Sequence, residues 1–191
     1  MTLGTGFPDD YLQAQIRRRL KPGVVLKLFR RMDDGRVHEK RFVVVHVDAH
    51  TTTCVINSEI SPFIRARPSL LRCQVMMQVA QHDFMHHDSH IDCSRVRSFL
   101  TDEVIADLMT RPEWILGDAS EQCRSDIIAG IKSTETLSVS DVARICDALA
   151  GEGAGCGVER KRPTSKEVLS RSPEYPPIWL GLPCPARVIS I

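Results

Sequence analysis

A chain of 191 residues that is 42% hydrophobic is long enough for one domain of ordinary size with a buried core, plus an appendage. Its formal net charge of +1 excludes a global electrostatic attraction to nucleic acid or to a membrane. No apolar run approaches the roughly 20 residues of a membrane-spanning helix, so we expect a soluble protein with no membrane partner.

The charge is unevenly distributed along the chain. Residues 1–47 carry ten Lys/Arg against five Asp/Glu, residues 48–150 carry nine against fifteen, and residues 151–191 carry six against four. A basic N-terminal part beside an acidic part would suit a polyanionic ligand. Ordinary solvated charge explains the same counts without a ligand.

The seven cysteines are widely spaced, odd in number and include no CxxC pair. The sequence does not begin with a basic segment followed by an apolar one, the pattern of a secretory leader. Such cysteine usage is typical of reduced thiols rather than of a disulfide framework. We therefore expect a cytoplasmic protein.

The first half of the chain has the pattern of strands. After a short helix that starts at Asp9 and ends before the KPG at 21–23, β-rich segments indicate strands at 24–31, 37–47 and 50–58. The Asp-Asp-Gly at 33–35 predicts a hairpin between the first two. A loop at 61–69, a strand at 70–79, an exposed polar loop at 82–87 and a strand at 90–96 follow.

From Thr101 the apolar spacing becomes helical. It predicts a helix at 101–109 with a Thr-Asp-Glu cap, a break between Pro112 and Gly117, and helices at 120–132 and 138–149. Strands first and helices after indicate an α+β domain with a compact barrel-like sheet. We divide the chain into an N-terminal extension with a short helix (1–20), this domain (21–150), and a Gly/Pro-rich flexible tail (151–191).

The segment from His82 to Ser94, HDFMHHDSHIDCS, holds the densest polar chemistry in the chain. His82 and His86 are four residues apart and His90 follows, so a zinc site is one interpretation. That spacing has meaning only in a helix, and no second ligand pair accompanies it, so we favour a polar loop without metal. Cys93 lies three residues from His90, on the other face of a strand, which argues against thiol catalysis.

Several segments, in their order, resemble the PemK/MazF-like endoribonuclease toxins. KPG at 21–23 and a short strand are followed by KRF at 40–42, which leads into VVV, and by a β-branched strand that ends with INS at 56–58. FMHHDSHIDCSRVRSF at 84–99 is similar to the strand before the family's terminal helices, and LGDASEQCRSDIIAGI at 116–131 to the turn and helix after it. The resemblance covers Lys21 to about Leu149 and rests on order and spacing.

The resemblance implies a small SH3-like β-barrel followed by C-terminal helices. It also implies a homodimer that cuts single-stranded RNA without a metal or cofactor and that is held in check by an antitoxin protein. The catalytic residues that it suggests are Arg41, Ser58, Glu59 and Asp92. The residues that we expect to contact the substrate are Lys40, Asn57, His90, Ser94 and Arg95.

Metal-free RNA cleavage needs a base for the 2′-hydroxyl proton, a cation on the phosphorane oxygens and an acid for the leaving 5′-oxygen. We expect Arg41 to supply the cation, Glu59 or Asp92 the base, and His90 the acid. Structural alternatives remain for each residue. Arg41 can instead pair with Glu39, and the short polar side chains at the strand ends, Asp92 among them, can cap turns.

Two positions depart from the family's pattern. Phe42 follows the arginine where the family has a proline, and the usual threonine is absent from the turn at Asn57. These departures favour an alternative function, a non-catalytic SH3-like module that binds RNA or a protein partner in the same groove.

Overall fold

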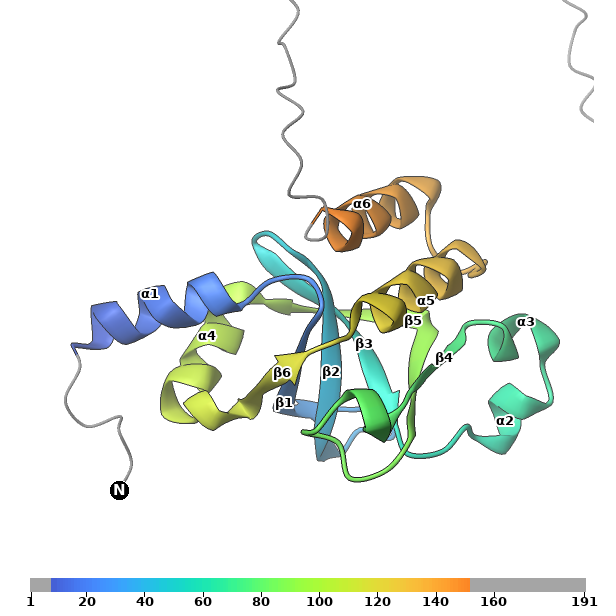
Figure 1. Cartoon of the computed structure of the whole chain (residues 1–191), viewed down its shortest axis with the longest axis horizontal. Helices are drawn as coiled ribbons and strands as arrows, with labels where there is room; N and C mark the ends of the chain where they lie inside the picture. The colour runs from blue at the N-terminus through green and yellow to red at the C-terminus, as the bar shows by residue number, and fades with distance from the viewer. Residues whose placement is uncertain (1–7, 152–191) are drawn as a thin grey trace, which may run out of the picture. The chain divides into compact units, whose positions relative to one another are not determined.

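Six antiparallel strands form the centre of the computed structural model, which describes residues 8–151 (Figure 1). The sheet has the order β4-β5-β3-β2-β1-β6 and curls into a half-barrel. The strands are β1 (Val24–Arg31), β2 (Val37–Val47), β3 (His50–Asn57), β4 (Gln74–Met77), β5 (Ser89–Leu100) and β6 (Ile115–Asp118). The α+β class with a curled sheet, predicted from the sequence, is confirmed. The predicted flexible tail lies outside the described residues, apart from Gly151.

The first two strands form the hairpin that the Asp-Asp-Gly sequence predicts. Gly35 has φ of +76°, a left-handed conformation that glycine adopts without steric cost. The backbone N–H of Met32 donates to the carbonyl oxygen of Arg36 at 2.8 Å, and the Asp34 carboxylate accepts from the N–H of Arg36 at 3.0 Å. These bonds close the turn and leave the neighbouring Asp33 free to reach toward β5.

The buried segment at 42–45 supplies both faces of the sheet. Because side chains alternate along a strand, Val43 and Val45 join the core beneath α5 (Glu121–Lys132) and α6 (Val139–Ala150). Phe42 and Val44 join the opposite core, with α1 (Asp9–Arg19) and α4 (Thr101–Thr110). The Phe42 ring is fully buried and meets the Phe99 ring edge-on at 5.5 Å. Burying such a side chain stabilises the fold by about 1.5–3 kcal/mol.

Strand β5 bends between its first part, residues 89–92, which pairs with β4, and its second part, residues 96–100, which pairs with the first half of β3. Cys54 lies opposite Val96, yet its neighbour Val55 lies opposite Asp92, so the residues between 92 and 96 form a bulge. Two threonines of the α5–α6 connection donate hydrogen bonds to the carbonyl oxygen of Ser94 inside this bulge, at 2.5 and 3.3 Å. The bend is therefore tied to the helical side of the domain.

The segment between β3 and β4 differs from the sequence prediction. In place of a loop at 61–69, the chain forms two one-turn helices, α2 (Pro62–Arg65) and α3 (Pro68–Leu71), each with a proline in its first turn. The Ser61 hydroxyl caps α2 by accepting from the N–H of Ile64. The strand predicted at 70–79 shortens to Gln74–Met77, because α3 takes its first residues and the 3₁₀ turn η1 (Val79–Gln81) takes its last.

Two further differences lie after β5. A short 3₁₀ turn, η2 (Pro112–Trp114), leads into the unpredicted strand β6, which pairs with β1. Helix α4 has Leu100 at its N-cap and no side-chain cap, so the predicted Thr-Asp-Glu cap is wrong. The Thr101 hydroxyl instead donates to the carbonyl oxygen of Asp48 at 3.0 Å. Among residues 8–151, no helix is both long and apolar enough to cross a membrane.

His82 fastens the β4–β5 connection to the start of α5. Its side chain is 2% exposed; Nδ1 donates to the carbonyl oxygen of Gln78 at 2.8 Å, and Nε2 accepts from the N–H of Ser120 at 3.0 Å. This pair of bonds requires the neutral imidazole with its proton on Nδ1. His82 is therefore a structural residue, and both ring nitrogens are occupied.

We expect His82→Ala to lower the free energy of unfolding by about 2–3 kcal/mol, because it leaves a buried N–H and a buried carbonyl without partners. His86, an exposed histidine on the same connection, provides the matched control, and His86→Ala should change stability by less than about 0.5 kcal/mol. Urea unfolding followed by circular dichroism measures both. Equal midpoints for the two variants would contradict this role.

Candidate functional site

The strand register decides which of the expected site residues share a face. Phe42 lies opposite Val55, and Val55 lies opposite Asp92, whereas Arg41 lies opposite Ile56. Residues directly opposite in an antiparallel pair share a face, and neighbours along a strand alternate. Arg41 and Asp92 therefore project from opposite faces of the sheet. The structure separates them into two hollows and does not form the single groove expected from the sequence.

Arg41 lines the smaller hollow, of about 170 Å³, which we name the Arg41 hollow. Its lining comes from β1, β2, the end of β3 and the start of β5: Lys27, Glu39, Lys40, Arg41, Ile56, Ser58, His87 and Ser89. Three cationic side chains share this hollow with one carboxylate. The hollow therefore favours an anionic ligand.

Arg41 is a half-buried residue, and its guanidinium has no side-chain hydrogen bond or ion pair with any other residue between 8 and 151. The structural alternative, a pair with Glu39, does not form, because Glu39 pairs with Lys27 at 2.9 Å. A guanidinium presents parallel N–H donors that match two oxygens of a phosphate. Arg41 is thus placed to receive a phosphate group in the hollow.

His87 brings an imidazole to the same hollow. Its Nδ1 donates to the carbonyl oxygen of Asp88 at 2.9 Å, and the Ser89 hydroxyl lies 3.2 Å from the same nitrogen. These contacts orient the ring and leave Nε2 without a partner among the described residues. His87 therefore adds to the lining of the hollow an imidazole with one nitrogen that has no partner among the described residues.

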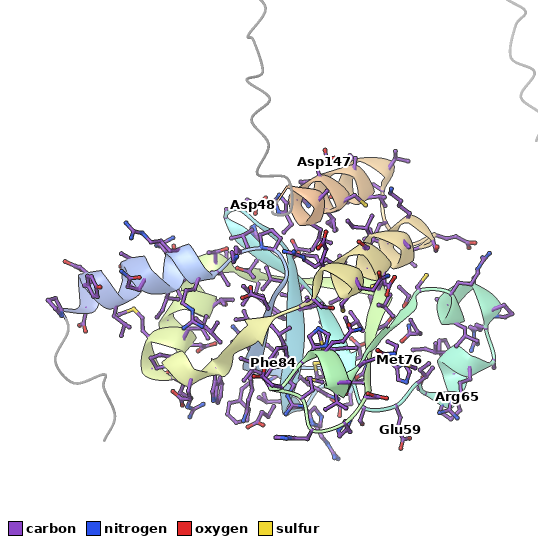
Figure 2. The ribbon with its side chains drawn as sticks, in the orientation of Figure 1. Asp48, Glu59, Arg65, Met76, Phe84 and Asp147 are labelled. Carbon is purple, nitrogen blue, oxygen red and sulfur yellow. The ribbon has the colours of Figure 1, made fainter. Side chains whose placement is uncertain are left out.

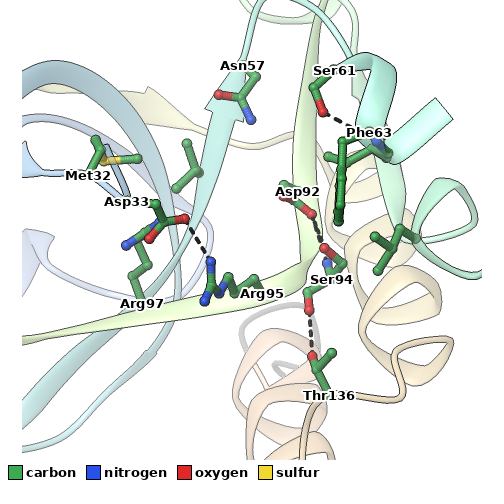
Figure 3. Close-up of a pocket in the computed structure, with 13 residues that line it drawn as sticks. Met32, Asp33, Asn57, Ser61, Phe63, Asp92, Ser94, Arg95, Arg97 and Thr136 are labelled. Carbon is green, nitrogen blue, oxygen red and sulfur yellow. Dashed lines mark hydrogen bonds and ion pairs between the residues drawn. The ribbon is translucent and has the colours of Figure 1, made fainter. Parts of the chain in front are cut away.

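Asp92 lines the larger hollow, of about 670 Å³, which we name the Asp92 pocket (Figure 3). It opens between the β1–β2 turn, the end of β3, helices α2 and α3, and the β5 bulge. The residues that line it are Met32, Asp33, Val55, Asn57, Ser61, Phe63, Ile64, Leu70, Asp92, Ser94, Arg95, Arg97 and Thr136. Apolar side chains thus form much of a wall that also carries two carboxylates and two guanidinium groups.

One carboxylate oxygen of Asp92 holds the bulge together. Oδ1 accepts from Nε2 of Gln74 at 2.7 Å, from the backbone N–H of Ser94 at 3.0 Å and from the hydroxyl of Ser94 at 2.6 Å (Figure 3). This is the turn-capping alternative foreseen for Asp92. Oδ2 makes no hydrogen bond with the described residues, so the pocket retains one free acceptor.

Asp33 joins the β1–β2 turn to β5 across the mouth of the Asp92 pocket. Its Oδ2 accepts from Arg95 at 2.7 Å and from Arg97 at 2.9 Å (Figure 3). The hydrogen bond from Arg97 is the largest cause that lowers the pKa of Asp33, and the positive charges of both arginines add to it. We name this group the Asp33 clasp.

The other expected site residues divide between the two hollows. Asn57, Ser94 and Arg95 line the Asp92 pocket, whereas Ser58 and Lys40 line the Arg41 hollow. Lys40 also donates through Nζ to Oδ1 of Asn57 at 3.4 Å, which links the two hollows.

Two expected residues line neither hollow. His90 lies opposite Asn57 in the β3–β5 ladder, so it shares the face of the Asp92 pocket but stands beside it. Glu59 is exposed just beyond the end of β3, at the lower edge of the molecule in Figure 2. The expected roles of His90 as acid and Glu59 as base therefore have no support from position.

The histidine-rich segment and its cysteine offer no second chemistry. Among residues 8–151, no group of three or more His, Cys, Asp or Glu side chains is arranged to hold a metal ion. Cys93 is fully buried, and a hydrogen bond with Cys54, followed by burial, raises its pKa well above the usual thiol value. Such a thiol is a poor nucleophile at neutral pH.

Sequence reasoning missed Lys27, Glu39 and His87 in the Arg41 hollow and Asp33 and Arg97 in the Asp92 pocket. The alternation of side chains in the predicted hairpin was a usable signal for the first two, because Lys27 lies opposite Arg41, and Glu39 is two residues before it. The other three depend on the course of a loop, a turn and a bulge, which the sequence pattern does not fix.

No family model matches the sequence, and no curated protein matches it. The function is therefore inferred from the two hollows.

We expect the pKa of Asp33, measured by carboxyl ¹³C NMR titration, to lie below the usual aspartate value and to rise toward it in Arg97→Gln. The rise in Arg95→Gln should be smaller, because the Arg97 hydrogen bond is the largest cause. Since the folded pKa is lowered, the clasp contributes stability above the unfolded pKa, and this is lost as the pH falls through the folded value.

Asp48 is the internal control for this titration. Its pKa is lowered chiefly by the backbone N–H of His50, away from the clasp, and should be the same in both variants. An Asp33 pKa that does not respond to Arg97→Gln would contradict the clasp.

Proposed function

We propose that this protein is a metal-independent endoribonuclease that acts on single-stranded RNA, related to the PemK/MazF-like toxins, and that its chemistry takes place in the Arg41 hollow. The observation that carries the proposal is the half-buried Arg41, whose guanidinium has no partner among the described residues, in one hollow with Lys40, Ser58 and His87. Two of the expected catalytic residues, Arg41 and Ser58, meet here.

The hollow holds each group that metal-free cleavage requires. Glu39, which pairs with Lys27, takes the proton from the ribose 2′-hydroxyl. The 2′-oxygen then forms a bond to phosphorus, while Arg41 and Lys40 stabilise the charge on the non-bridging oxygens. The bond to the 5′-oxygen breaks as His87, which enters the step as the imidazolium, donates its Nε2 proton to that oxygen and is left neutral. The products are a 2′,3′-cyclic phosphate and a 5′-hydroxyl, so no water or co-reactant is consumed in this step.

Fold and partners belong to the same proposal. The curled sheet serves as an SH3-like barrel and α5 and α6 as the terminal helices of the family. A homodimer and a regulatory antitoxin protein follow from the same relationship, and an acidic segment of such a partner would fit the cationic Arg41 hollow. Single-stranded RNA as the substrate places the protein in the cytoplasm.

We expect the purified protein to cut a mixed-sequence single-stranded RNA in a buffer that contains EDTA, and Arg41→Ala to reduce the rate by about 100- to 1000-fold, because a preorganised donor to the transition state is lost. Arg36→Ala removes an exposed arginine of the β1–β2 turn outside both hollows and should leave the rate unchanged. Gel electrophoresis of end-labelled RNA measures both. Intact RNA with the wild-type protein would refute the proposal.

The adjacent histidines provide a separate test of the proton transfer. His87→Gln should lower kcat by about 100-fold and remove a limb of its pH profile, because the group that exchanges the proton is lost. His86→Gln changes an exposed neighbour outside the hollow and should keep the wild-type profile. An unchanged pH profile in His87→Gln would exclude His87 as the acid.

One observation favours the alternative, a non-catalytic SH3-like module that binds RNA or a protein partner. Asp92, an expected catalytic residue, projects from the face opposite Arg41, and one of its oxygens accepts hydrogen bonds that stabilise the bulge. A binding module would retain RNA in a gel-shift assay, lose it in Arg41→Ala and leave it uncut at every pH. If the wild-type protein cuts RNA and Arg41→Ala abolishes the cutting, the result supports the nuclease and excludes the binding module.

A further inference from the structure

We propose that the Asp92 pocket binds one nucleobase of the RNA strand, next to the nucleotides that flank the cleaved phosphate, and thereby sets the sequence preference. This inference rests on the proposed function, because it places the cleaved phosphate in the Arg41 hollow. It assigns a second binding site, in which the charges balance, on the other face of the sheet.

The pocket has the size and the wall for a flat aromatic ligand. Its volume of about 670 Å³ falls within the range of small-molecule sites. Phe63 on α2 is 59% exposed, and its ring stands beside Asp92 and Ser94 (Figure 3). The Arg67 guanidinium lies 3.6 Å from the centre of the Phe63 ring and holds the ring in place. A base can stack on such a ring whatever its identity.

The pocket also presents a matched donor and acceptor. Oδ2 of Asp92 and Nδ2 of Asn57 have no partner among the described residues, although Oδ1 of each side chain accepts a hydrogen bond. Single-stranded bases are recognised by hydrogen bonds along their edges, where N–H donors and acceptors stand side by side. One free acceptor and one free donor suit such an edge.

The charges of the two hollows indicate which part of a nucleotide each hollow would bind. In the Asp92 pocket two carboxylates balance two guanidinium groups, and the Asp33 clasp already pairs three of these four groups. In the Arg41 hollow, three cations share the space with one carboxylate. A phosphate therefore prefers the Arg41 hollow, and an uncharged base prefers the partly apolar Asp92 pocket.

The two hollows meet at the end of β3. Asn57 lines the Asp92 pocket and the next residue, Ser58, lines the Arg41 hollow. Lys40 lines the Arg41 hollow and donates to Asn57. A strand that crosses this end of β3 can therefore place a phosphate on one side and a neighbouring base on the other.

Substrate length tests the inference. We expect Phe63→Ala to raise KM for a hexanucleotide about tenfold through lost stacking and to leave KM for a dinucleotide, which has only the scissile phosphate, unchanged. Leu71→Ala, an exposed apolar residue of α3 outside the pocket, should alter neither substrate. Phe63 is exposed, so its truncation leaves the core intact. Equal effects of Phe63→Ala on both substrates would overturn the inference.

Base preference gives a second readout. Asp92→Asn replaces an acceptor in the pocket by a donor, so we expect the preferred base to change at one position just outside the two nucleotides that flank the cut, while Arg41-dependent cleavage persists. Sequencing of the fragments from a random RNA pool measures this. A wild-type preference in Asp92→Asn would overturn the inference and leave the nuclease proposal standing.

Two binding measurements distinguish this inference from its alternatives. If the wild-type protein cuts no RNA, the nuclease proposal fails, and fluorescence anisotropy with an uncleavable 2′-O-methyl hexanucleotide still tests the pocket. Weaker binding in Phe63→Ala than in Leu71→Ala supports a base in the pocket, and equal binding overturns it. If a nucleoside 5′-monophosphate binds as tightly as the hexanucleotide, the pocket is a site for a free nucleotide. That result would overturn the inference that the pocket binds a base of an RNA strand.

Discussion

The pairing register of β2, β3 and β5 is the constraint on which both hollows depend. The fully buried segment at 42–45 fixes it, because Phe42 and Val44 fill one core while Val43 and Val45 fill the other. A slip by one residue would exchange the two faces and expose or overpack each core. The same register sends Arg41 to one side of the sheet. The charge in the Arg41 hollow is thus positioned by hydrophobic packing that lies immediately beside it in the sequence.

The β5 bulge is the second constraint, and it reverses what simple alternation predicts. Asp92 and Arg97 are an odd number of residues apart, so in a regular strand they would lie on opposite faces. Because the register shifts between Cys54 and Val55, Asp92 and Arg97 share one face and line one pocket. The three hydrogen bonds to Oδ1 of Asp92 stabilise the bend that causes this. One carboxylate therefore supports the backbone with one oxygen and leaves the other free.

How far the sequence could predict the molecule follows from these two constraints. The Asp-Asp-Gly turn and the buried β-rich segments are local signals, so β1, β2 and β3 were predicted within a residue or two. Helices α2 and α3 and strand β6 are about one turn or four residues long, and their stability comes from neighbours distant in sequence. Arg41 and Ser58 were found together, but Asp92 was expected with them, because a bulge leaves no periodic signal. His90 was expected at the site instead of His87, because side chains in a loop do not alternate regularly and their directions cannot be predicted from spacing.

The structure explains Phe42, one of the two positions that differ from the pattern the sequence resembles. The pattern has a proline at this position, whereas the Phe42 ring fills a core against Phe99 and lies opposite Val55 in the β2–β3 pair. That ring lies on the face opposite Arg41, so the substitution changes the packing beneath the sheet and leaves the guanidinium in its hollow. The two adjacent residues at the end of β3 are divided in the same way, because Asn57 lines the Asp92 pocket and Ser58 lines the Arg41 hollow. The Arg41 guanidinium and the free hydrogen-bonding groups of Asp92 and Asn57 are thereby held on separate faces, so a change in one need not disturb the other.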